Sequence, residues 1–580
     1  MATVENLLTD HIDLWTTATK RRSGAGRGSS SKIELYGIKK LRELVLELAV
    51  RGLLVRQDTS EEPANELLNR IHAEKTKLYA EGKIKKGKAT SPVLEKDFPF
   101  LLPPGWIWVR LGDITNFGKT VKSEGIDDNV WVLDLEDIEK DTSNLLKKIR
   151  FYERRSISDK NSFKKGDVLY GKLRPYLNKV IVADEDGVCT TEILPIRCYG
   201  PFNSDYFKTV LRSAYFLEYV NARSYGMKMP RLGTEDGRQA FFPLPPLSEQ
   251  YRIVAKVDEL IALCDSLEQQ TNVSLSVQQT LVESLLNALV IAADHDQFAN
   301  AWQHISEYFD TLFTSEESID LLKQTILQVA VMGKLVSQDP NDEPASDLLK
   351  KVAAEKAMLV KEGKIRNAKP LPPIADEEMP FELPSGWAFC RLQELVSVLG
   401  DGLHGTPNYN DNGDYYFING NNLNGGKIVI KSGTKRVDLM EFEKHRKDLS
   451  DRTVFVSING TIGNVAFYSN EPVILGKSAC YFNLLNGIEK LFIQRVIESR
   501  HFFQYAASQA TGSTISNLGL KAMNFFPIPL PHMAEQKRIV AKVDELLTLC
   551  DRLKFRLSEA LATQLRLSEA LTDKAFARGG

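Results

Sequence analysis

The sequence predicts an α+β protein in which two mixed α/β domains are joined by long antiparallel coiled-coil helices, with a pseudo-two-fold internal repeat. Three observations lead to this prediction. The chain aligns with itself in two blocks, the stretches between those blocks do not align, and each copy ends in an extended helical pattern. Self-similarity over such a distance indicates a duplicated structural unit.

The repeat is read directly from the residues. A shift of 281 residues aligns 37–112 with 318–393 without a gap, and 33 of the 76 positions are identical. A shift of 286 residues aligns 226–267 with 512–553. The intervening stretches, 113–225 and 394–511, show no alignment by eye. The two copies therefore share the aligned blocks, which we call the frames, and differ in the stretches between them, which we call the middles.

Length and composition set the class of protein. At about 150 residues per domain, 580 residues suggest about four structural units. With 74 basic and 76 acidic residues, the net charge indicates no partner, so any basic surface must be local. The six cysteines form no CxxC pair, which favours a reducing cytoplasm, and no apolar run reaches the roughly 18 residues of a membrane span. We expect a cytoplasmic protein without a membrane partner.

Each repeated frame begins with helical patterns. Ile38–Val55 has apolar residues at helical spacing with Gly52 near its end, and Ala64–Glu81 follows Pro63, which suits a helix start. The Lys-rich stretch Lys83–Pro104 is typical of a linker. The second frame repeats this order.

Each middle predicts a compact mixed domain of about 140 residues. In the first, "VLDLEDI", "DVLYGKL" and "KVIVAD" are predicted strands and Ser204–Asn221 a helix. In the second, "DYYFING", "KIVIKS", "RTVFVSING" and "NVAFYS" are predicted strands and Lys490–Ser508 a helix. "LNGGK" (Leu423–Lys427) lies between strand candidates, which predicts a hairpin.

The helix that closes each copy carries an apolar stripe at steps of four and three, which needs a partner helix. We expect the two helices to pair along this seam; the alternative is that each stripe packs on its own domain. The predicted seam residues are Ile253, Val257, Leu260, Cys264, Leu267, Ile539, Val543, Leu546, Cys550 and Leu553.

These patterns give seven segments. They are a mobile N-terminal tail (1–36), an N-terminal helical region with its linker (37–105), a first mixed α/β domain (106–246), a central helix region (247–317), a second helical region with its linker (318–386), a second mixed α/β domain (387–532) and a distal helix (533–580).

No catalytic or metal-binding constellation is recognisable. The eight histidines form no HExxH pair, and "LGKS" (Leu475–Ser478) has Glu471 where a P-loop needs its first glycine. Cys189 in "GVCTTE" has no nearby histidine, so a buried apolar role is expected. We expect a chain that has no catalytic residue, metal or cofactor of its own.

The sequence does contain residues that suit a binding surface. Lys147–Arg174 holds ten basic residues against three acidic ones, with aromatic residues interleaved. Such an excess suits phosphate binding, and it equally suits a solvated face. The candidate DNA contacts in the first domain are Lys172, Arg174, Tyr176, Asn178, Lys179, Lys228 and Arg231.

The second middle is rich in amides and hydroxyls instead. Such groups on loops can bind base edges, and Asn and Gly are also what turns require. The candidate contacts are His404, Asn408, Tyr409, Asn421, Asn422, Asn459, Ser513, Thr514 and Asn517.

Two dissimilar middles are each led by "LPPGWIWVRL" or "LPSGWAFCRL" and followed by "PLPPLSEQYRIVAKVDEL" or "PLPHMAEQKRIVAKVDEL". This layout resembles the specificity subunit of type I restriction-modification systems. "LAVRGLLVRQD" and "VAVMGKLVSQD" resemble the variety with conserved repeats at the N-terminus and in the centre. Loop residues vary within the family, so none is transferred.

The resemblance implies a non-catalytic subunit in which 106–246 and 387–532 are two target-recognition domains that each bind half of a bipartite, asymmetric double-stranded DNA target. Its helices would hold two methyltransferase subunits, which use S-adenosylmethionine, and through them two ATP- and Mg-dependent restriction subunits. The chain would belong to an adenine DNA methyltransferase and ATP-dependent endonuclease complex in phage defence. The alternative from the residues is a pseudo-symmetric coiled-coil assembly adaptor that does not bind DNA.

Overall fold

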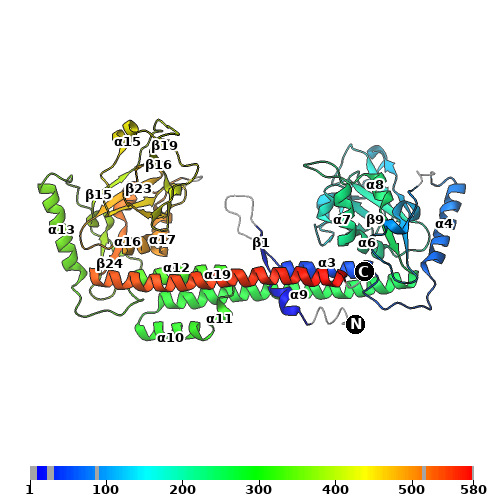
Figure 1. Cartoon of the computed structure of the whole chain (residues 1–580), viewed down its shortest axis with the longest axis horizontal. Helices are drawn as coiled ribbons and strands as arrows, with labels where there is room; N and C mark the ends of the chain where they lie inside the picture. Colours follow the sequence, from blue (N-terminus) through cyan, green and yellow to red (C-terminus); the bar gives the residue numbers. More distant parts are fainter. Residues whose placement is uncertain (1–9, 23–31, 85–89, 513–516, 578–580) are drawn as a thin grey trace. The chain divides into compact units, whose positions relative to one another are not determined.

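The chain forms two compact units joined by two long helices. The computed structural model describes residues 10–22, 32–84, 90–512 and 517–577. Unit 1 comprises Met1–Ser274 with Ala560–Gly580, and unit 2 comprises Leu275–Glu559. The helices α9 (Leu247–Ile291) and α19 (Met533–Ala577), with 45 residues each, contribute to both units (Figure 1). The division falls at nearly equivalent points of the two helices under the 286-residue shift.

Unit 1 has the following elements before α9. They are α2 (Ile12–Thr17), β1 (Lys20–Arg22), β2 (Lys32–Glu34), α3 (Tyr36–Val50), α4 (Ala64–Ala80), β3 (Ile107–Arg110), α5 (Leu111–Ile114), β4 (Thr115–Phe117), β5 (Thr120–Val121), β6 (Trp131–Leu133), β7 (Ile149–Arg150), β8 (Lys160–Phe163), β9 (Val168–Gly171), β10 (Val180–Val182), β11 (Gly187–Thr190), β12 (Ile193–Cys198), α6 (Ser204–Arg212), α7 (Ala214–Arg223), α8 (Thr234–Gln239) and β13 (Phe241–Leu244).

Unit 2 follows the same plan between α9 and α19. Its elements are α10 (His295–Glu307), α11 (Phe309–Leu312), α12 (Glu316–Val331), α13 (Ala345–Lys361), β14 (Ala388–Arg391), α14 (Leu392–Leu395), β15 (Val396–Asp401), β16 (Tyr415–Ile418), β17 (Leu423–Asn424), β18 (Lys427–Ile428), β19 (Arg436–Val437), α15 (Leu439–His445), β20 (Thr453–Ser457), β21 (Val465–Phe467), β22 (Val473–Leu475), β23 (Ala479–Leu484), α16 (Lys490–Ile497), α17 (Arg500–Gln509), α18 (Leu520–Phe525) and β24 (Pro527–Leu530).

The two middles share a topology that their sequences do not reveal. A four-stranded sheet has the order β4-β12-β9-β10 in unit 1 and β15-β23-β20-β21 in unit 2. A second sheet contains one parallel pair in each unit, β6 with β11 and β16 with β22. The first and last strands of each domain also pair, β3 with β13 and β14 with β24. Strands of two to six residues preserve this order while their residues and loops differ.

The predicted frame helices are confirmed as α3 and α4. Gly52 follows α3 with φ +68°, and Gly333 follows α12 at the equivalent point with φ +72°. A glycine in this left-handed conformation commonly ends a helix. A Cβ on Gly52 would lie 2.5 Å from Pro103 Cγ, and one on Gly333 would lie 2.4 Å from Pro384 Cγ. The repeated glycine and the repeated "LP" therefore fit together, which attaches each linker to its helix.

Three predicted segments differ from the structure: the helices Ser204–Asn221 and Lys490–Ser508, which are each divided in two, and the strand "KIVIKS". Ser213 divides the expected helix Ser204–Asn221 into α6 and α7, because its hydroxyl caps α7 by accepting from Phe216 N at 3.2 Å. "KIVIKS" is a strand only at Lys427–Ile428, and the Asn422 side chain donates to Val429 O at 2.9 Å, where a further strand partner would bind. The predicted hairpin at "LNGGK" is confirmed by the pairing of β17 with β18.

The described part of the expected mobile tail also differs from its prediction. Ile12–Thr17 forms α2, and Trp15 on it is fully buried. Gly37 N donates to Ala18 O at 2.8 Å, and a Cβ on Gly37 would lie 2.3 Å from Trp15 O. This segment packs on α3 because Gly37 lets the two backbones approach closely.

The predicted seam residues are largely buried. Ile253, Val257, Leu260 and Cys264 are buried in unit 1, and Ile539, Val543 and Cys550 in unit 2; Leu267, Leu546 and Leu553 are half-buried. The unit 2 residues belong to one apolar cluster that also includes Leu286 of α9, Leu322 of α12 and Phe492 of α16. The stripe of α19 thus enters the core of its own unit, in a cluster to which α9 also contributes.

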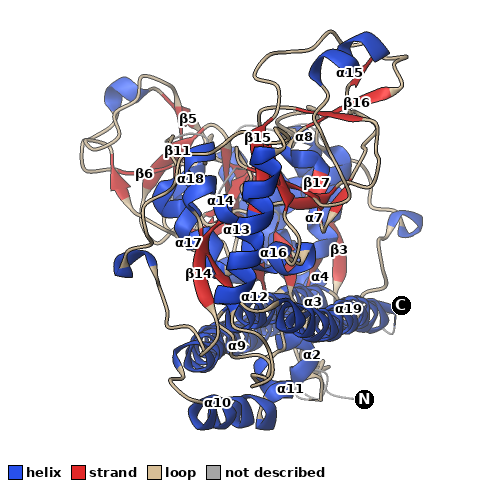
Figure 2. Cartoon of the chain, turned by 90° about the vertical axis from the view of Figure 1, so that its left-hand side faces the viewer, coloured by secondary structure: helices blue, strands red, loops and turns tan. Residues whose placement is uncertain are grey.

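Unit 2 has helices on two sides of α12 and α19. The strand-bearing domain lies on one side, and α10 with α11 lies on the other (Figures 1 and 2). Ile305, Leu312 and Phe313 connect α10 and α11 to the main cluster, and Gln278 on α9 donates to Thr311 O at 2.7 Å. No helix in the described part of the chain is long and apolar enough to cross a membrane.

Candidate nucleic-acid interface

Two loops of the first domain meet at one end of β9. The β9–β10 loop (172–179) joins a hairpin at 225–231 through a backbone bridge between Leu173 and Arg231, and a second bridge, between Tyr225 and Arg231, closes the hairpin itself. Arg174 N donates to Pro230 O at 2.7 Å, and Leu232 N donates to Lys172 O at 3.0 Å. Candidate residues more than 50 positions apart in the sequence therefore share one surface.

The second domain has the same pair of loops. Asn459 and Thr511 each form a bridge with Asn517, and Leu518 N donates to Ile458 O at 2.8 Å. The hairpins also begin alike, since Gly226 has φ +104° and Gly512 has φ +102°, in a region that L side chains rarely adopt. Ser513 and Thr514 lie outside the described residues.

A short 3-10 turn completes each site. It is Leu135–Asp137 in the first domain and Gly420–Asn422 in the second. In the first domain, Lys179 Nζ donates to Leu135 O at 2.6 Å and so links this turn to the β9–β10 loop. In the second domain, Ser478 links the turn to the loop that follows β20. Its hydroxyl accepts from Gly420 N, and its backbone carbonyl accepts from Ile458 N. Each domain thus brings three loops together.

The β9–β10 loop is held in a defined conformation. Arg174 and Asn178 both have φ +50° and flank the 3-10 turn Pro175–Leu177. Left-handed backbone at residues other than glycine costs roughly 1–2 kcal/mol, so surrounding contacts must maintain it. Asn178 supplies one, because its side-chain amide donates to Arg212 O at 2.9 Å.

The first-domain candidates separate into free and engaged side chains. Arg174, Tyr176 and Lys228 are exposed. Arg231 donates to both carboxylate oxygens of Glu192, at 2.7 and 2.9 Å. Burial lowers the pKa of Lys179, whose ammonium is bound to the Leu135 carbonyl. We therefore assign Asn178 and Lys179 to supporting the loop, and Lys172, Arg174, Tyr176 and Lys228 to its surface.

The second-domain candidates occupy two areas. His404 pairs with Asp401, and the neighbouring Leu403 N donates to Leu475 O at 2.7 Å. This bond places the His404 loop beside the 476–478 segment. That segment in turn contacts the Gly420–Asn422 turn and Asn459. Asn408 instead donates to Glu441 Oε2 at 3.1 Å, and Tyr409 lies against Phe417 with ring centroids 5.9 Å apart.

Asn421 and Asn422 differ in exposure. Asn421 is exposed, whereas Asn422 is buried. The Asn422 amide donates to Val429 O and Thr434 Oγ1, and its Oδ1 accepts from Asn419 N. Because these bonds use its side chain within the fold, we assign Asn422 a structural role.

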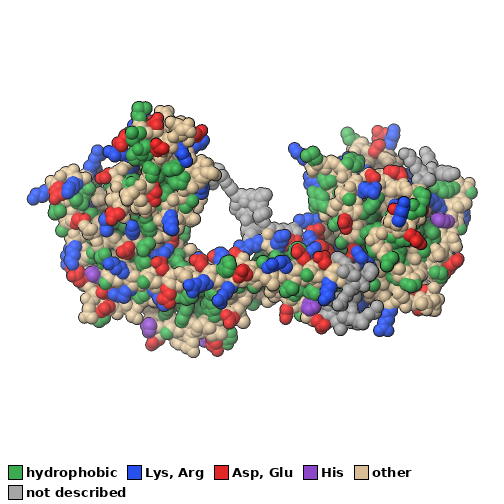
Figure 3. Space-filling model, viewed as in Figure 1, with side chains coloured by type: hydrophobic (Ala, Val, Ile, Leu, Met, Phe, Trp, Pro, Cys, Tyr) green, Lys and Arg blue, Asp and Glu red, His purple; other side chains and the backbone are tan. Residues whose placement is uncertain are grey.

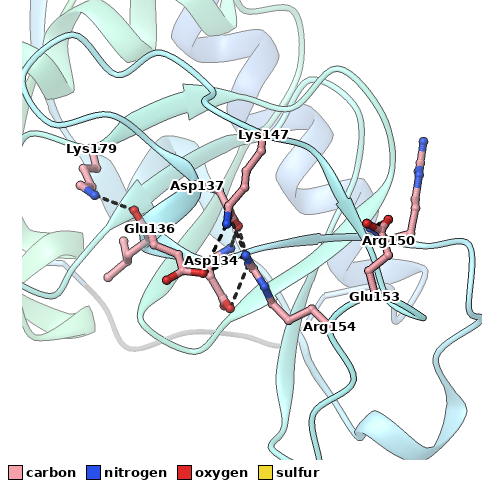
Figure 4. A network of polar contacts seen from close by, with 9 residues as sticks. Asp134, Glu136, Asp137, Lys147, Arg150, Glu153, Arg154 and Lys179 are labelled. Carbon is pink, nitrogen blue, oxygen red and sulfur yellow. Dashed lines mark hydrogen bonds and ion pairs between the residues drawn. The ribbon is translucent and has the colours of Figure 1, made fainter.

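The basic run Lys147–Arg174 is mostly compensated by acidic residues from elsewhere. Arg154 donates to Asp137, whose side chain is fully buried, and to Asp134 and Glu136, and Lys147 lies 3.7 Å from Asp137 (Figure 4). Lys148, Arg150, Arg155 and Lys164 also form ion pairs. Basic and acidic side chains are intermixed on the face of each unit in Figure 3. Among the exposed basic residues of this run, Lys165, in the turn before β9, and Arg174, in the β9–β10 loop, have no acidic partner in the described part of the chain.

Sequence reasoning missed the exposed apolar residues of the hairpin. Tyr225, Met227 and Met229 are all exposed, and the two methionines flank Lys228. The signal was the tip sequence "GMKMP", which stands where the second copy has "GSTIS".

The repeated "EQ" motif has a structural role that its sequence did not disclose. Glu249 is buried and accepts from Trp106 Nε1 at 2.9 Å and Gln57 Nε2 at 2.8 Å. Gln250 accepts from Asn203 N at 3.0 Å and donates to Pro245 O at 3.2 Å. These bonds fasten the domain and its N-terminal frame to the start of α9.

The second copy repeats this clamp. Glu535 accepts from Gln338 at 2.8 Å, Gln536 accepts from Glu489 N at 2.8 Å, and Arg538 pairs with Asp342 at 2.6 Å. The repeated residues of the motif therefore hold each domain to its long helix in the same way. Among the described residues, no group of three or more His, Cys, Asp or Glu could hold a metal ion.

These features define a chain with two matched loop sites, each clamped to a long helix by the same residues. Residues 384–562 match the family model described as "Type I restriction modification DNA specificity domain". The chain is 39% identical to the EcoAI specificity subunit and 38% identical to the EcoEI specificity subunit of type I restriction enzymes from Escherichia coli. Each alignment covers 99% of this chain and 100% of the relative. The chain therefore belongs to the type I restriction enzyme specificity subunits.

A solved structure is also similar. It comes from work titled as the structural basis of complex assembly and conformational transition of the type I R-M system. It is 20% identical to this chain, covers 82% of this chain and 99% of its own, and has a TM-score of 0.49.

Proposed function

We propose that this chain recognises a bipartite, asymmetric DNA sequence, with residues 106–246 binding one half and residues 387–532 the other. The observation that supports this proposal is the matched pair of three-loop sites. The same backbone frame presents Arg174, Tyr176 and Lys228 in one unit and Asn421, Asn459 and Asn517 in the other. A shared frame with unlike side chains suits two domains that dock alike and bind different bases.

In this proposal the chain is non-catalytic and its helices hold two methyltransferase subunits and, through them, two restriction subunits. Exposed residues that are identical in the two long helices support equivalent docking sites. Leu263 and Leu549 are both exposed, as are Glu259 and Glu545. S-adenosylmethionine, ATP and Mg would be bound by those partner subunits.

The long helices would act as an antiparallel spacer between the half-sites, related by a pseudo-two-fold axis. In unit 2, Asp320 pairs with Lys554 and Asp342 with Arg538, so the sequence around α12 runs opposite to α19. In unit 1, Arg42 pairs with Asp265 and Glu61 with Arg252, so α3 likewise runs opposite to α9. Two equal arrangements support a spacer with equivalent ends.

The test uses the double variant Lys172→Ala, Arg174→Ala in the full chain with its methyltransferase subunits. Each lost phosphate contact should lower the slope of log affinity against log salt by about one and weaken binding to all sequences. Lys165→Ala is the matched control, because Lys165 is an exposed residue of the same basic run, in the turn at the opposite end of β9.

We expect the double variant to lose both affinity and salt slope while the control keeps both. Unchanged affinity and slope in the double variant would disprove the assignment of these residues. Absence of any DNA footprint for the wild-type complex would instead support an assembly adaptor.

A further inference from the structure

The hairpin at 225–231 exposes an unusual set of side chains. Met227 is fully exposed, and Tyr225 and Met229 are more than half exposed. Exposed methionine is not unusual alone, but two methionines and a tyrosine on one seven-residue turn make an apolar tip. Apolar side chains that project in this way gain free energy only when a partner covers them.

The surroundings of this tip indicate which partner it fits. Arg174, Lys172 and Lys228 lie on or beside the hairpin, and the described residues offer none of them an ion pair. Most other basic residues of the first domain's basic run do have acidic partners, as shown above. An apolar tip surrounded by uncompensated positive charge is complementary to DNA, where phosphates flank the apolar features of a groove.

The two copies share the residues at the base of this hairpin in backbone arrangement and differ in the sequence of its tip. Under the 286-residue shift, Gly226 matches Gly512, Arg231 matches Asn517, and both pairs have the same backbone arrangement. In sequence, Met227 matches Ser513, Lys228 matches Thr514 and Met229 matches Ile515. Apolar character is kept at the third position, and Met227 replaces a hydroxyl.

We propose that Met227 is a specificity-determining residue that makes an apolar contact with the bases of the half-site recognised by the first domain. This inference rests on the proposed DNA recognition. A thioether cannot donate a hydrogen bond and is a weak acceptor, so Met227 distinguishes bases by apolar contact. Two features of DNA offer that contact, the thymine methyl group in the major groove and an opened base step that a methionine can enter.

The experiment compares Met227→Ser, which installs the residue of the second copy, with the wild-type chain, each expressed with its methyltransferase subunits. Methylated adenines are mapped across the genome, and affinity is measured on the wild-type site at several salt concentrations. Met358→Ser is the matched control, because Met358 is an exposed methionine on α13 of the other unit.

We expect Met227→Ser to accept an additional base at one position of one half-site and to lose about fourfold in affinity, the value for one buried methyl-sized group, at unchanged salt slope. Lys228→Ala should instead keep the recognised sequence and lower the salt slope by about one. Met358→Ser should change neither quantity.

A second arm identifies the contact. Replacing thymine by uracil at the relaxed position should weaken wild-type binding about fourfold and leave Met227→Ser unaffected if the methyl group is the contact. An increase in 2-aminopurine fluorescence at that step, seen with the wild type and absent with Met227→Ser, would identify insertion instead. Either result supports the inference.

An unchanged recognition sequence and unchanged affinity in Met227→Ser would overturn the inference, as would relaxation at positions in both half-sites. These outcomes are distinct from failure of the proposed function, because in that case the wild-type complex itself would show no sequence-specific methylation.

Discussion

At the residue scale, the repeated motif is a clamp. The sequence identified "EQ" as distinctive through its repetition, but repetition could not reveal its partners. Trp106 and Gln57, which donate to Glu249, lie more than 140 positions away in sequence. The pairing became visible only when the fold brought the linker to the start of α9.

This clamp predicts a stability change. Glu249→Ala should lower the free energy of unfolding by about 1–3 kcal/mol, because it leaves the buried Trp106 indole N–H without its acceptor. Glu259→Ala on the same helix is the control, since its exposed side chain pairs with the neighbouring Lys256 of the same helix, and it should change stability by less than about 0.5 kcal/mol. Equal unfolding midpoints in urea for the two variants would contradict the clamp.

The same residue predicts a pH dependence. Burial raises the pKa of Glu249, although hydrogen bonds from Trp106 and Gln57 oppose the shift. A carboxyl whose pKa is raised in the folded state contributes stability below its unfolded pKa, and that contribution is lost as pH rises through the folded pKa. Relative to Glu249→Gln, the wild type should therefore lose stability from about pH 4 towards neutrality. A constant difference across that range would contradict the raised pKa.

At the element scale, helices were predicted better than strands. The periodicity of Ile38–Val55 and Ala64–Glu81 gave α3 and α4, whereas "KIVIKS" became mostly loop because the Asn422 side chain binds the Val429 carbonyl. The common topology of the two middles was not predictable, since hydrogen bonds between short strands fix it and their residues are free to differ.

The candidate site was predicted in part. Lys172 and Lys228 were selected as separate basic residues, and the structure places their loops together through the bridge of Leu173 with Arg231. Lys179 and Asn422 were selected for their chemistry, and both side chains are bound within the fold. The sequence shows which side chains are present, but it does not show which of them form hydrogen bonds within the folded domain.

The turn at Asp134–Asp137 gives a prediction for this scale. Arg154→Ala should destabilise the first domain by about 3 kcal/mol, because it removes the main partner of the fully buried Asp137 side chain. Lys147→Ala provides the comparison, since Lys147 is half-exposed and 3.7 Å from Asp137, and it should cost less than about 1 kcal/mol. Hydrogen exchange of β6 and β9 measures the effect locally, and similar protection in both variants would contradict this ranking.

At the scale of the whole molecule, we propose that the long helices set the distance between the two half-sites. A heptad is about 10.5 Å of helix, which corresponds to roughly three base pairs. Deleting the matched segments 270–276 and 556–562 should shorten the gap between half-sites and leave their bases unchanged. Deleting only one segment should disrupt the register and reduce methylation. An unchanged gap after the matched deletion would show that the helices do not set it.

The central claim is that two domains on one repeated frame each recognise one half of the target. The most direct measurement maps methylated adenines for a chain in which residues 387–532 also replace residues 106–246, expressed with its methyltransferase subunits. The repeated frame provides equivalent junctions for this exchange. We predict methylation of an inverted repeat of the half-site recognised by the second domain. Retention of the original asymmetric sequence, or a complete absence of sequence preference in an intact complex, would contradict the account.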